Sequence, residues 1–316
     1  MEPVRVEMTR GDVVESVHAV SLVVLDPDGT PVTTAGEVDR PVYGRSSLKP
    51  AQAVAVLETA GADLTDAETA LAAGSHSGER RHLEAVTALL ARHDLTPDAL
   101  RCVPDLPLGA DAARAWLATG HGPEPLAMNC SGKHAAMLVA TGGDPGYLDP
   151  GHPLQQRCRA AVTALAGPVL TASTDGCGAP AFATTLTDLA RLPWRLARAG
   201  EGTTAGRVAA AMRAHPWLVA GTGRLDTVLM TEVPGVLAKS GAEGVLVVAL
   251  PDGRALAAKV DDGQARALGP VLADLLGPAG APALTAVTTP AVVGGGRPVG
   301  GWRTRWPGGS PADSAE

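Results

Sequence analysis

The 316-residue chain carries a net charge of −7, with 45% hydrophobic and 19% charged residues. This composition is typical of a globular protein that buries a large core, and it excludes a disordered chain. The basic residues are scattered and there are only five Trp, two Tyr and one Phe. Neither a basic patch nor a base-stacking platform is indicated, so nucleic acid is not an expected partner.

The N-terminal segment MEPVRVEMTRGDVVES is charged throughout and lacks the apolar region of a signal peptide. No apolar run approaches the roughly 18 to 20 residues of a membrane span. Four cysteines are too few for a dense disulfide framework in a chain of this length, so we expect free thiols at Cys102, Cys130, Cys158 and Cys177. A cytoplasmic protein without a membrane partner is therefore predicted.

Strands are predicted near both ends of the chain and helices between them. Residues 18–38 and 244–263 each contain two β-rich runs around an Asp-Gly turn, which is a strong hairpin signal. Apolar residues recur at helical spacing in the segments between these hairpins. The predicted helical segments are 48–62, 66–75, 79–95 and 153–167.

The order of strands, helices and strands predicts an α/β sandwich. Its mixed sheet combines the N-terminal and C-terminal strands, and a helical lobe is inserted between them. We expect one domain over residues 1–302. The remaining residues, 303–316, are rich in Gly, Pro and Ser and are predicted to form a flexible tail.

Ser46 and Lys49 form an S-x-x-K pattern in the segment YGRSSLKPAQA. Residues three apart share a helix face, so Lys49 can reach the Ser46 hydroxyl. A desolvated lysine can act as the base that activates a serine. The alternative is a helix that begins with Ser46 or Ser47 as its N-cap, followed by a solvated lysine.

Two further segments carry hydroxyl and amine groups. Lys239 lies in AKSGAEGV, a Lys-Ser-Gly element before the last hairpin, which in combination with S-x-x-K is typical of penicillin-recognising serine enzymes. Ser75 lies in the polar loop AAGSHSGE after a predicted helix. Each segment alone is as compatible with an ordinary turn or connection.

The segments MNCSGKHAAML and STDGCGAPAFA place Cys130 and Lys133 on one helical face and Cys177 between glycines. Two thiolates with a third protein ligand and water would form an open zinc site. The alternative is that these thiols are buried and bind no metal.

The segments GRSSLKPAQ, NCSGKHAAML, GHPLQQ, ASTDGCGAP, VAGTGRLDTVLM and KSGAEGV together resemble the asparaginase II family over residues 5–300. This family is similar to the inducible, thermolabile L-asparaginases of rhizobia and is distinct from the threonine-nucleophile asparaginases. Ala136 stands where the family typically has Gly. The resemblance implies a fold similar to serine β-lactamases and glutaminases, and a homodimer.

The resemblance also implies roles for individual residues. Its two Ser-Lys pairs fall on Ser46 with Lys49 and on Ser75 with Lys239, and its zinc ligands on Cys130, Lys133 and Cys177. By the same resemblance Asp175 belongs to this pocket, and His134 and Arg45 flank it. Arg224, in the segment GTGRLDT, is a candidate with Arg45 for binding the substrate α-carboxylate, since arginine binds carboxylates bidentately. The alternative for Arg224 is a structural salt bridge with Asp226.

The expected reaction is hydrolysis of L-asparagine to L-aspartate and ammonia. We assign the nucleophile to Ser46 and its base to Lys49, with Ser75 and Lys239 relaying protons to the ammonia. The reverse assignment of the two serines stays open. Zinc would either polarise the amide carbonyl or position the substrate.

Three other functions fit parts of the pattern. A glutaminase or a lactam hydrolase would share the S-x-x-K and K-S-G elements. A cysteine amidohydrolase would use Cys130 with His134, but two residues four apart on one helix rarely have the geometry for base catalysis. A non-catalytic amino-acid sensor would be expected to lack part of the Ser-Lys set, which this chain retains.

Overall fold

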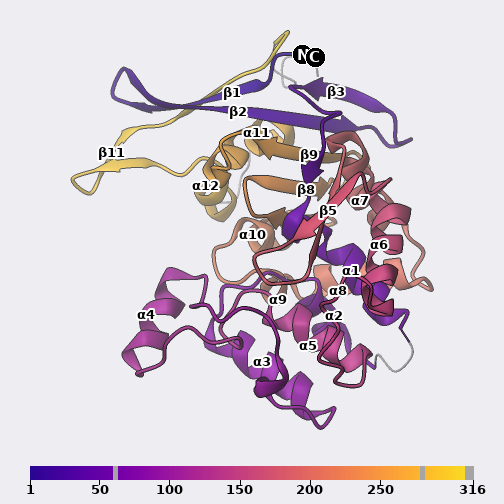
Figure 1. The fold of residues 1–316 in the computed structure, drawn as a ribbon. Coiled ribbons are helices and arrows are strands. Elements are labelled where there is room, and N and C mark those ends of the chain that lie inside the picture. Colours follow the sequence, from indigo (N-terminus) through magenta and orange to yellow (C-terminus); the bar gives the residue numbers. More distant parts are fainter. Residues whose placement is uncertain (60–62, 278–281, 310–316) are drawn as a thin grey trace. The chain divides into compact units, whose positions relative to one another are not determined.

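The computed structural model describes residues 1–59, 63–277 and 282–309 (Figure 1). The chain divides into two compact units, each described here by itself. The first comprises Met1–Val42, Thr185–Trp194 and Gly223–Glu316, and the second comprises Tyr43–Thr184 and Arg195–Thr222. The two ends of the chain thus form one unit and the helix-rich middle forms the other, while the single domain over 1–302 stays a prediction.

The first unit is built around a seven-stranded sheet of order β12-β1-β2-β9-β8-β7, with β3 paired to β2 (Figure 1). Its strands are β1 (Val4–Arg10), β2 (Val13–Leu25), β3 (Pro31–Ala35), β7 (Leu237–Gly241), β8 (Val245–Ala249), β9 (Ala255–Val260) and β12 (Trp302–Arg305). The sheet joins N-terminal and C-terminal strands, which confirms the predicted α/β class. Both predicted hairpins, β2–β3 and β8–β9, are also confirmed.

The centre of this sheet is buried on both faces. Every residue of β8 is buried, and so is every residue of β2 from Val20 to Leu25. Strands covered on both sides read as continuous apolar runs rather than as alternating ones. Each strand pair described in this sheet is antiparallel, whereas a mixed sheet was expected. Short connections account for the antiparallel pairs β1–β2, β2–β3, β7–β8 and β8–β9, because parallel neighbours need a long crossover.

The helices of the first unit are short. They are α10 (Leu225–Glu232), α11 (Leu268–Leu276) and α12 (Pro282–Thr288), with the 3₁₀ turn η3 (Ala265–Ala267). Helix α10 contacts β7 and α12, and α11 contacts β1 and β12. Helix α7 (Leu186–Arg198) begins in this unit and ends in the other. A small hairpin, β10 (Val292–Gly294) with β11 (Arg297–Gly300), precedes β12.

Two segments at the ends of the chain form strands that the sequence did not predict. The charged N-terminal segment contains β1, in which Val4 and Val6 are buried while Arg5 between them points to solvent. Strand β12 pairs with β1, so Arg305 lies opposite Arg5. The prediction of a flexible tail from residue 303 is therefore wrong for 303–305, because backbone pairing with β1 orders a segment of polar composition. Residues 310–316 lie outside the described residues.

The second unit is mainly helical. Its helices are α1 (Lys49–Leu57), α2 (Asp66–Ala72), α3 (Arg80–Ala91), α4 (Ala110–Ala118), α5 (Ser131–Ala140), α6 (Pro153–Ala166), α8 (Thr204–Ala214) and α9 (Pro216–Val219), with the 3₁₀ turns η1 (Arg45–Leu48) and η2 (Pro97–Ala99). All four predicted helical segments form helices, namely α1, α2, α3 and α6. Within the described ranges, no helix combines the length and apolarity that crossing a bilayer would require.

Helices α1 and α5 form the interior of the second unit. All ten residues of α5 and eight of the nine in α1 are buried, including the lysine in each helix. Helix α1 contacts α6, α8, α5 and α2. A three-stranded sheet of order β4-β6-β5 completes the unit, with β4 at Val42–Tyr43, β5 at Thr171–Thr174 and β6 at Pro180–Thr184. Polar groups on two buried helices must find partners inside the protein, which draws attention to the residues they carry.

Candidate active site

Ser46 lies in the 3₁₀ turn η1, immediately before α1. Its hydroxyl is half-buried and lies 3.5 Å from the hydroxyl of Ser75. The neighbouring Ser47 is fully buried and donates to the carbonyl oxygen of Gly44 at 2.6 Å, so Ser47 has the local structural role. The structure therefore brings the two predicted catalytic hydroxyls together and leaves the Ser46 hydroxyl free of any backbone contact among the described residues.

Arg45, which precedes Ser46, adopts a left-handed backbone conformation with φ of 51°. This region costs a non-glycine residue about 1 to 2 kcal/mol. The Arg45 guanidinium donates to Asp175 Oδ1 from Nε at 3.0 Å and from Nη2 at 2.9 Å. This charge-assisted contact holds the strained turn that presents Ser46, and it confirms that Arg45 and Asp175 are neighbours.

Ser75 follows α2 in an extended segment. Its backbone N–H donates to the carbonyl oxygen of Val219 at 2.8 Å. At Gly74 a side chain is excluded, because a Cβ atom would meet the carbonyl oxygens of Leu218 and Leu71 at 2.8 and 2.9 Å. This close approach of two backbones fixes where the Ser75 hydroxyl lies.

The Lys49 side chain is only 2% exposed, which excludes the solvated lysine weighed as the alternative. Its Nζ donates to Gly74 O at 2.6 Å and to Cys130 Sγ at 3.0 Å. Among the described residues it makes no hydrogen bond to the Ser46 hydroxyl, which S-x-x-K spacing had suggested. The amine instead lies against the backbone beside Ser75, and catalytic hydrogen bonds often form only once substrate is bound.

The predicted metal ligands are brought together at the start of α5. Cys130 is the N-cap residue of α5, and Lys133 follows one turn later. Lys133 Nζ lies 3.2 Å from Cys177 Sγ, and the Cys177 side chain also interacts with that of Cys130. All four cysteines of the chain are free, as predicted, and all four are buried. Two thiols and one amine from two separate segments therefore share one buried site.

The charges in this cluster are strongly coupled. Hydrogen bonding to Cys130, together with the Lys133 charge, holds the pKa of the Cys177 thiol far below its usual range. The same hydrogen bond and burial raise the pKa of Cys130 well above its usual range. Burial acts to lower the pKa of Lys133, but the two thiols outweigh it and the net shift is upward. The downward shift of the Cys177 pKa and the upward shift of the Lys133 pKa support each other, because each charge stabilises the other.

His134 completes the cluster. Burial and the adjacent Lys133 lower the pKa of His134 to about 4, so its ring is neutral. Its Nδ1 is 2.7 Å from the Tyr147 hydroxyl. Its Nε2 is buried and has no hydrogen-bond partner among the described residues. The nearby Cys177 raises the pKa of the ring, but burial and Lys133 outweigh it. Cys130 Sγ contacts Lys49 and Asn129 rather than His134, so the structure offers nothing in favour of a Cys130–His134 catalytic pair.

The cluster has the donor chemistry of a zinc site. Among the described residues, no group of three His, Cys, Asp or Glu side chains could hold a metal ion. The predicted set differs because its third donor is a lysine amine. Two thiolates and a nitrogen donor suit zinc, and the unpartnered His134 Nε2 adds a further nitrogen beside them. Binding would require Lys133 and Cys130 to lose their protons.

His76 connects the Ser75 loop to helix α5, a role that the sequence did not indicate. Its backbone N–H donates to Asn129 O at 3.0 Å, and its Nε2 is 3.0 Å from the Ser131 hydroxyl. The His76 ring stacks on His82, whose ring stacks on Trp217. Trp217 therefore packs within its own unit.

The small number of lysines is a feature of the sequence that indicates the site residues directly. The chain contains 26 Lys and Arg residues, and only four of them are lysines. Three of these four are Lys49, Lys133 and Lys239, with exposed fractions of 2%, 3% and 1%. Arginine stays charged in proteins, whereas lysine can lose its proton and act as a base, an acid or a metal ligand. The chain thus keeps lysine mainly at positions where this chemistry is expected.

Lys239 and Arg224 lie in the first unit. Lys239 lies on β7, while Ser75 belongs to the other unit, so the Ser75–Lys239 pair stays a prediction. Arg224 is half-buried, and its guanidinium makes no hydrogen bond or ion pair with any described residue. Its expected alternative partner, Asp226, pairs instead with Lys239 at 3.5 Å. The Arg224 guanidinium is therefore available for a ligand carboxylate.

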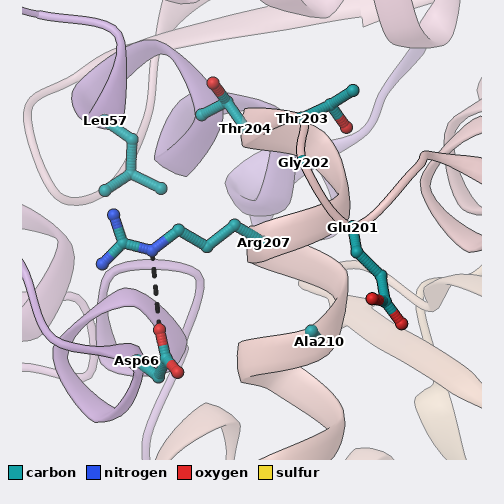
Figure 2. Close-up of a pocket in the computed structure, with 8 residues that line it drawn as sticks. All are labelled: Leu57, Asp66, Glu201, Gly202, Thr203, Thr204, Arg207 and Ala210. Carbon is teal, nitrogen blue, oxygen red and sulfur yellow. Dashed lines mark hydrogen bonds and ion pairs between the residues drawn. The ribbon is translucent and has the colours of Figure 1, made fainter.

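A separate cavity of about 480 Å³ lies in the second unit (Figure 2). Figure 2 shows Arg207 on α8 pointing toward Asp66 on α2, and their side chains are 3.5 Å apart. None of the predicted site residues lines this cavity. This cavity is thus distinct from the cluster of serines, lysines and thiols.

The site thus contains two adjacent serine hydroxyls and a buried lysine amine held against the Gly74 backbone. The model of the L-asparaginase II family matches residues 6–304 of the chain. The chain belongs to this family and is an amidohydrolase. No curated protein sequence matches it.

The chain is also similar to several solved structures at low identity. EstCE1, a hydrolase with promiscuous acyltransferase activity, shares 14% identity over 79% of this chain and 91% of its own, with a TM-score of 0.39. A β-lactamase from Mycobacterium bovis shares 16% over 77% and 87%, with a TM-score of 0.38. A Bacillus glutaminase shares 17% over 76% and 82%, with a TM-score of 0.32.

Proposed function

We propose that this protein is an L-asparaginase that hydrolyses the side-chain amide of L-asparagine to L-aspartate and ammonia. Family membership supports the amide chemistry. The observation that carries the catalytic assignment is the 3.5 Å approach of the Ser46 and Ser75 hydroxyls, with the buried amine of Lys49 in the same unit. A nucleophile, a second hydroxyl to pass protons and a titratable amine are what amide hydrolysis needs.

In this proposal the Ser46 oxygen attacks the side-chain carbonyl carbon and gives its proton to Lys49. Collapse of the tetrahedral intermediate breaks the C–N bond, and the nitrogen leaves as ammonia after receiving a proton. Ser75 lies close enough to Ser46 to relay that proton, with Lys239 as its expected donor. Water then hydrolyses the acyl-Ser46 ester to give L-aspartate. Lys49 returns its proton to the Ser46 oxygen as the ester bond breaks, and the proton released by water passes to Lys239. The reverse assignment of the two serines uses the same groups.

Two charged side chains are suited to bind the α-amino and α-carboxylate groups of the substrate. Asp175 uses Oδ1 for Arg45 and for the backbone N–H of Gly176, so its Oδ2 is free among the described residues to accept from an ammonium. The unpaired guanidinium of Arg224 matches a carboxylate bidentately. Arg45 has already committed two N–H groups to Asp175, which leaves it mainly a positioning role.

We also propose that Cys130, Lys133 and Cys177 bind zinc. When bound, the ion would supply positive charge that polarises a carbonyl or holds an anionic or amine group of the substrate. The protein contributes the buried donor set, and the Tyr147 hydroxyl orients the adjacent His134 ring. We further propose that the protein is a cytoplasmic homodimer, as the family resemblance implies.

A glutaminase is the second candidate, because it needs the same nucleophile and differs by one methylene in its substrate. A pocket distinguishes one methylene by only about 1 to 3 kcal/mol, so the two activities can coexist in one site. Ammonia release should be measured with L-asparagine, L-glutamine and a chromogenic lactam under saturating conditions. We expect L-asparagine to have the highest kcat/KM. Hydrolysis of the lactam alone, or no ammonia from either amino acid, would overturn the proposal.

A further inference from the structure

The Asp226 carboxylate contacts three polar groups of the Lys-Ser-Gly element. It lies in the first turn of α10 and has no exposed surface. Its Oδ1 accepts the backbone N–H of Ser240 at 2.5 Å, and its Oδ2 accepts the Ser240 hydroxyl at 2.6 Å. The same Oδ2 lies 3.5 Å from Lys239 Nζ. All of these residues belong to the first unit.

The Lys239 side chain is equally buried, with 1% exposed. Its Nζ donates to Ser240 O at 2.9 Å. In this unit β8 and α10 pack against β7, and α12 packs against α10. Strand β8 and helix α12 contain no titratable residue, and the other acid of α10, Glu232, is exposed. Among these elements of the first unit, as far as they are described, Asp226 is therefore the charged side chain that faces Lys239.

A buried charge is costly unless it is paired and hydrogen-bonded. A buried carboxylate beside a buried amine stabilises the ammonium form of that amine. A carboxylate at this position therefore disfavours a neutral Lys239 that could act as a base. Apolar surroundings would favour the neutral amine instead. The backbone contact matters as well, because Asp226 holds the N–H of the residue next to Lys239 and so restrains the strand that carries it.

The geometry points to Asp226 as a positioning residue that fixes Lys239 on β7 and keeps it in the ammonium form. This inference rests on the proposed function, in which Lys239 supplies the proton for departing ammonia. Lys239 then acts as a proton donor or cationic stabiliser, not as a general base. It is reprotonated when water hydrolyses the acyl-enzyme, so the proton balance over the cycle is closed.

The first test compares Asp226→Asn with Asp226→Glu. Asparagine has nearly the same shape and can still accept the Ser240 N–H, but it removes the charge. We expect kcat of Asp226→Asn to fall about 100-fold, with KM much less affected. The alkaline limb of its kcat profile should move about one pH unit or more to lower pH. Asp226→Glu restores the charge and should recover part of both changes.

The matched control is Asp274→Asn. Asp274 is a carboxylate of the same unit that accepts from Thr304 and from Trp306 Nε1, and it has no assigned role in the reaction. This variant should leave both kcat and the pH profile unchanged. If Asp226→Asn lowers kcat without moving the alkaline limb, Asp226 has only a structural role and the inference is overturned.

A second measurement does not depend on activity. The chain has four lysines, so selective ¹³Cε labelling of lysine gives four signals, and Lys239→Arg identifies that of Lys239. We expect the Lys239 signal of the wild-type chain to report an ammonium at neutral pH, and Asp226→Asn to shift its titration to lower pH. A neutral Lys239 at pH 7 in the wild-type chain would overturn the inference.

The two measurements separate the inference from the proposed function. If the wild-type chain releases no ammonia while Lys239 titrates as expected, the proposed function fails and the charge assignment stands. If ammonia is released but Lys239 is already neutral, the reverse holds. Should both Asp226 variants fail to fold, the wild-type titration still decides.

Discussion

The buried amine of Lys49 donates to the carbonyl oxygen of Gly74, 2.6 Å away, and Gly74 is the residue that precedes Ser75. Lys49, at the start of α1, is thereby fixed against the loop that carries Ser75. Ser46 lies three residues before Lys49 in the sequence. The two hydroxyls approach to 3.5 Å. The Lys49 amine is thus fixed beside the backbone of the Ser75 loop, and among the described residues it makes no hydrogen bond to either serine hydroxyl.

Ser46→Ala should abolish ammonia release, and Ser47→Ala should not. The first removes the proposed nucleophile, and loss of a nucleophilic serine costs at least about 1,000-fold in kcat. The second removes only the hydroxyl bound to Gly44 O, at a cost to stability of about 1 kcal/mol. Steady-state kinetics with thermal melting of both variants checks this. Equal activity of the Ser46→Ala and Ser47→Ala variants would contradict the assignment of Ser46 as the nucleophile.

Lys49→Met should lower kcat about 100- to 10,000-fold, because it removes the proposed base while keeping the length of the side chain. The Gly74 carbonyl and the Cys130 thiol also lose their partner, so some loss of stability should accompany it. The control is Lys259→Met at the fourth lysine, which is half-buried on β9 and has no assigned role. Retention of wild-type kcat in Lys49→Met at neutral pH would place the base elsewhere.

Elemental analysis of the purified chain should find about one zinc per chain, and Cys177→Ser should lose it. If zinc mainly positions substrate, this variant should raise KM more than it lowers kcat, and the opposite split would indicate carbonyl polarisation. Cys158→Ser is the matched control, since Cys158 is a fully buried free thiol with no predicted role. The zinc proposal would be refuted if metal-free protein were fully active and if neither a chelator nor added zinc changed that activity.

Acid should destabilise the protein in part through His82. Burial lowers the pKa of His82 below its ordinary value of 6.5, so the unfolded chain binds this proton more readily than the folded one. The stability due to neutral His82 is therefore complete above pH 6.5 and is lost as pH falls from 6.5 toward the folded pKa.

His82→Gln should flatten that dependence, because a glutamine amide can still donate to Trp217 O without titrating. Chemical denaturation at several pH values between 4 and 8 measures the slope. His121→Gln, at an exposed histidine, serves as the control and should keep the wild-type slope. An unchanged slope in His82→Gln would contradict the prediction.

Local pattern determined much of this protein. The Asp-Gly turns predicted the β2–β3 and β8–β9 hairpins, and apolar spacing predicted α1, α2, α3 and α6. Motif order identified the family and every residue that now forms the thiol cluster. These signals are local, because turn geometry and the 3.6-residue repeat depend only on neighbours along the chain.

Tertiary structure decided the rest. Lys49 reaches Gly74 and Cys130, 25 and 81 residues away, rather than Ser46 three residues away. Strand β12 is ordered by β1 at the other end of the chain, and Asp226 binds Lys239 and Ser240 across α10 and β7. Partners of this kind are chosen by which buried donors and acceptors remain unsatisfied after the elements pack. That choice depends on packing between distant segments, which no local period of the sequence encodes.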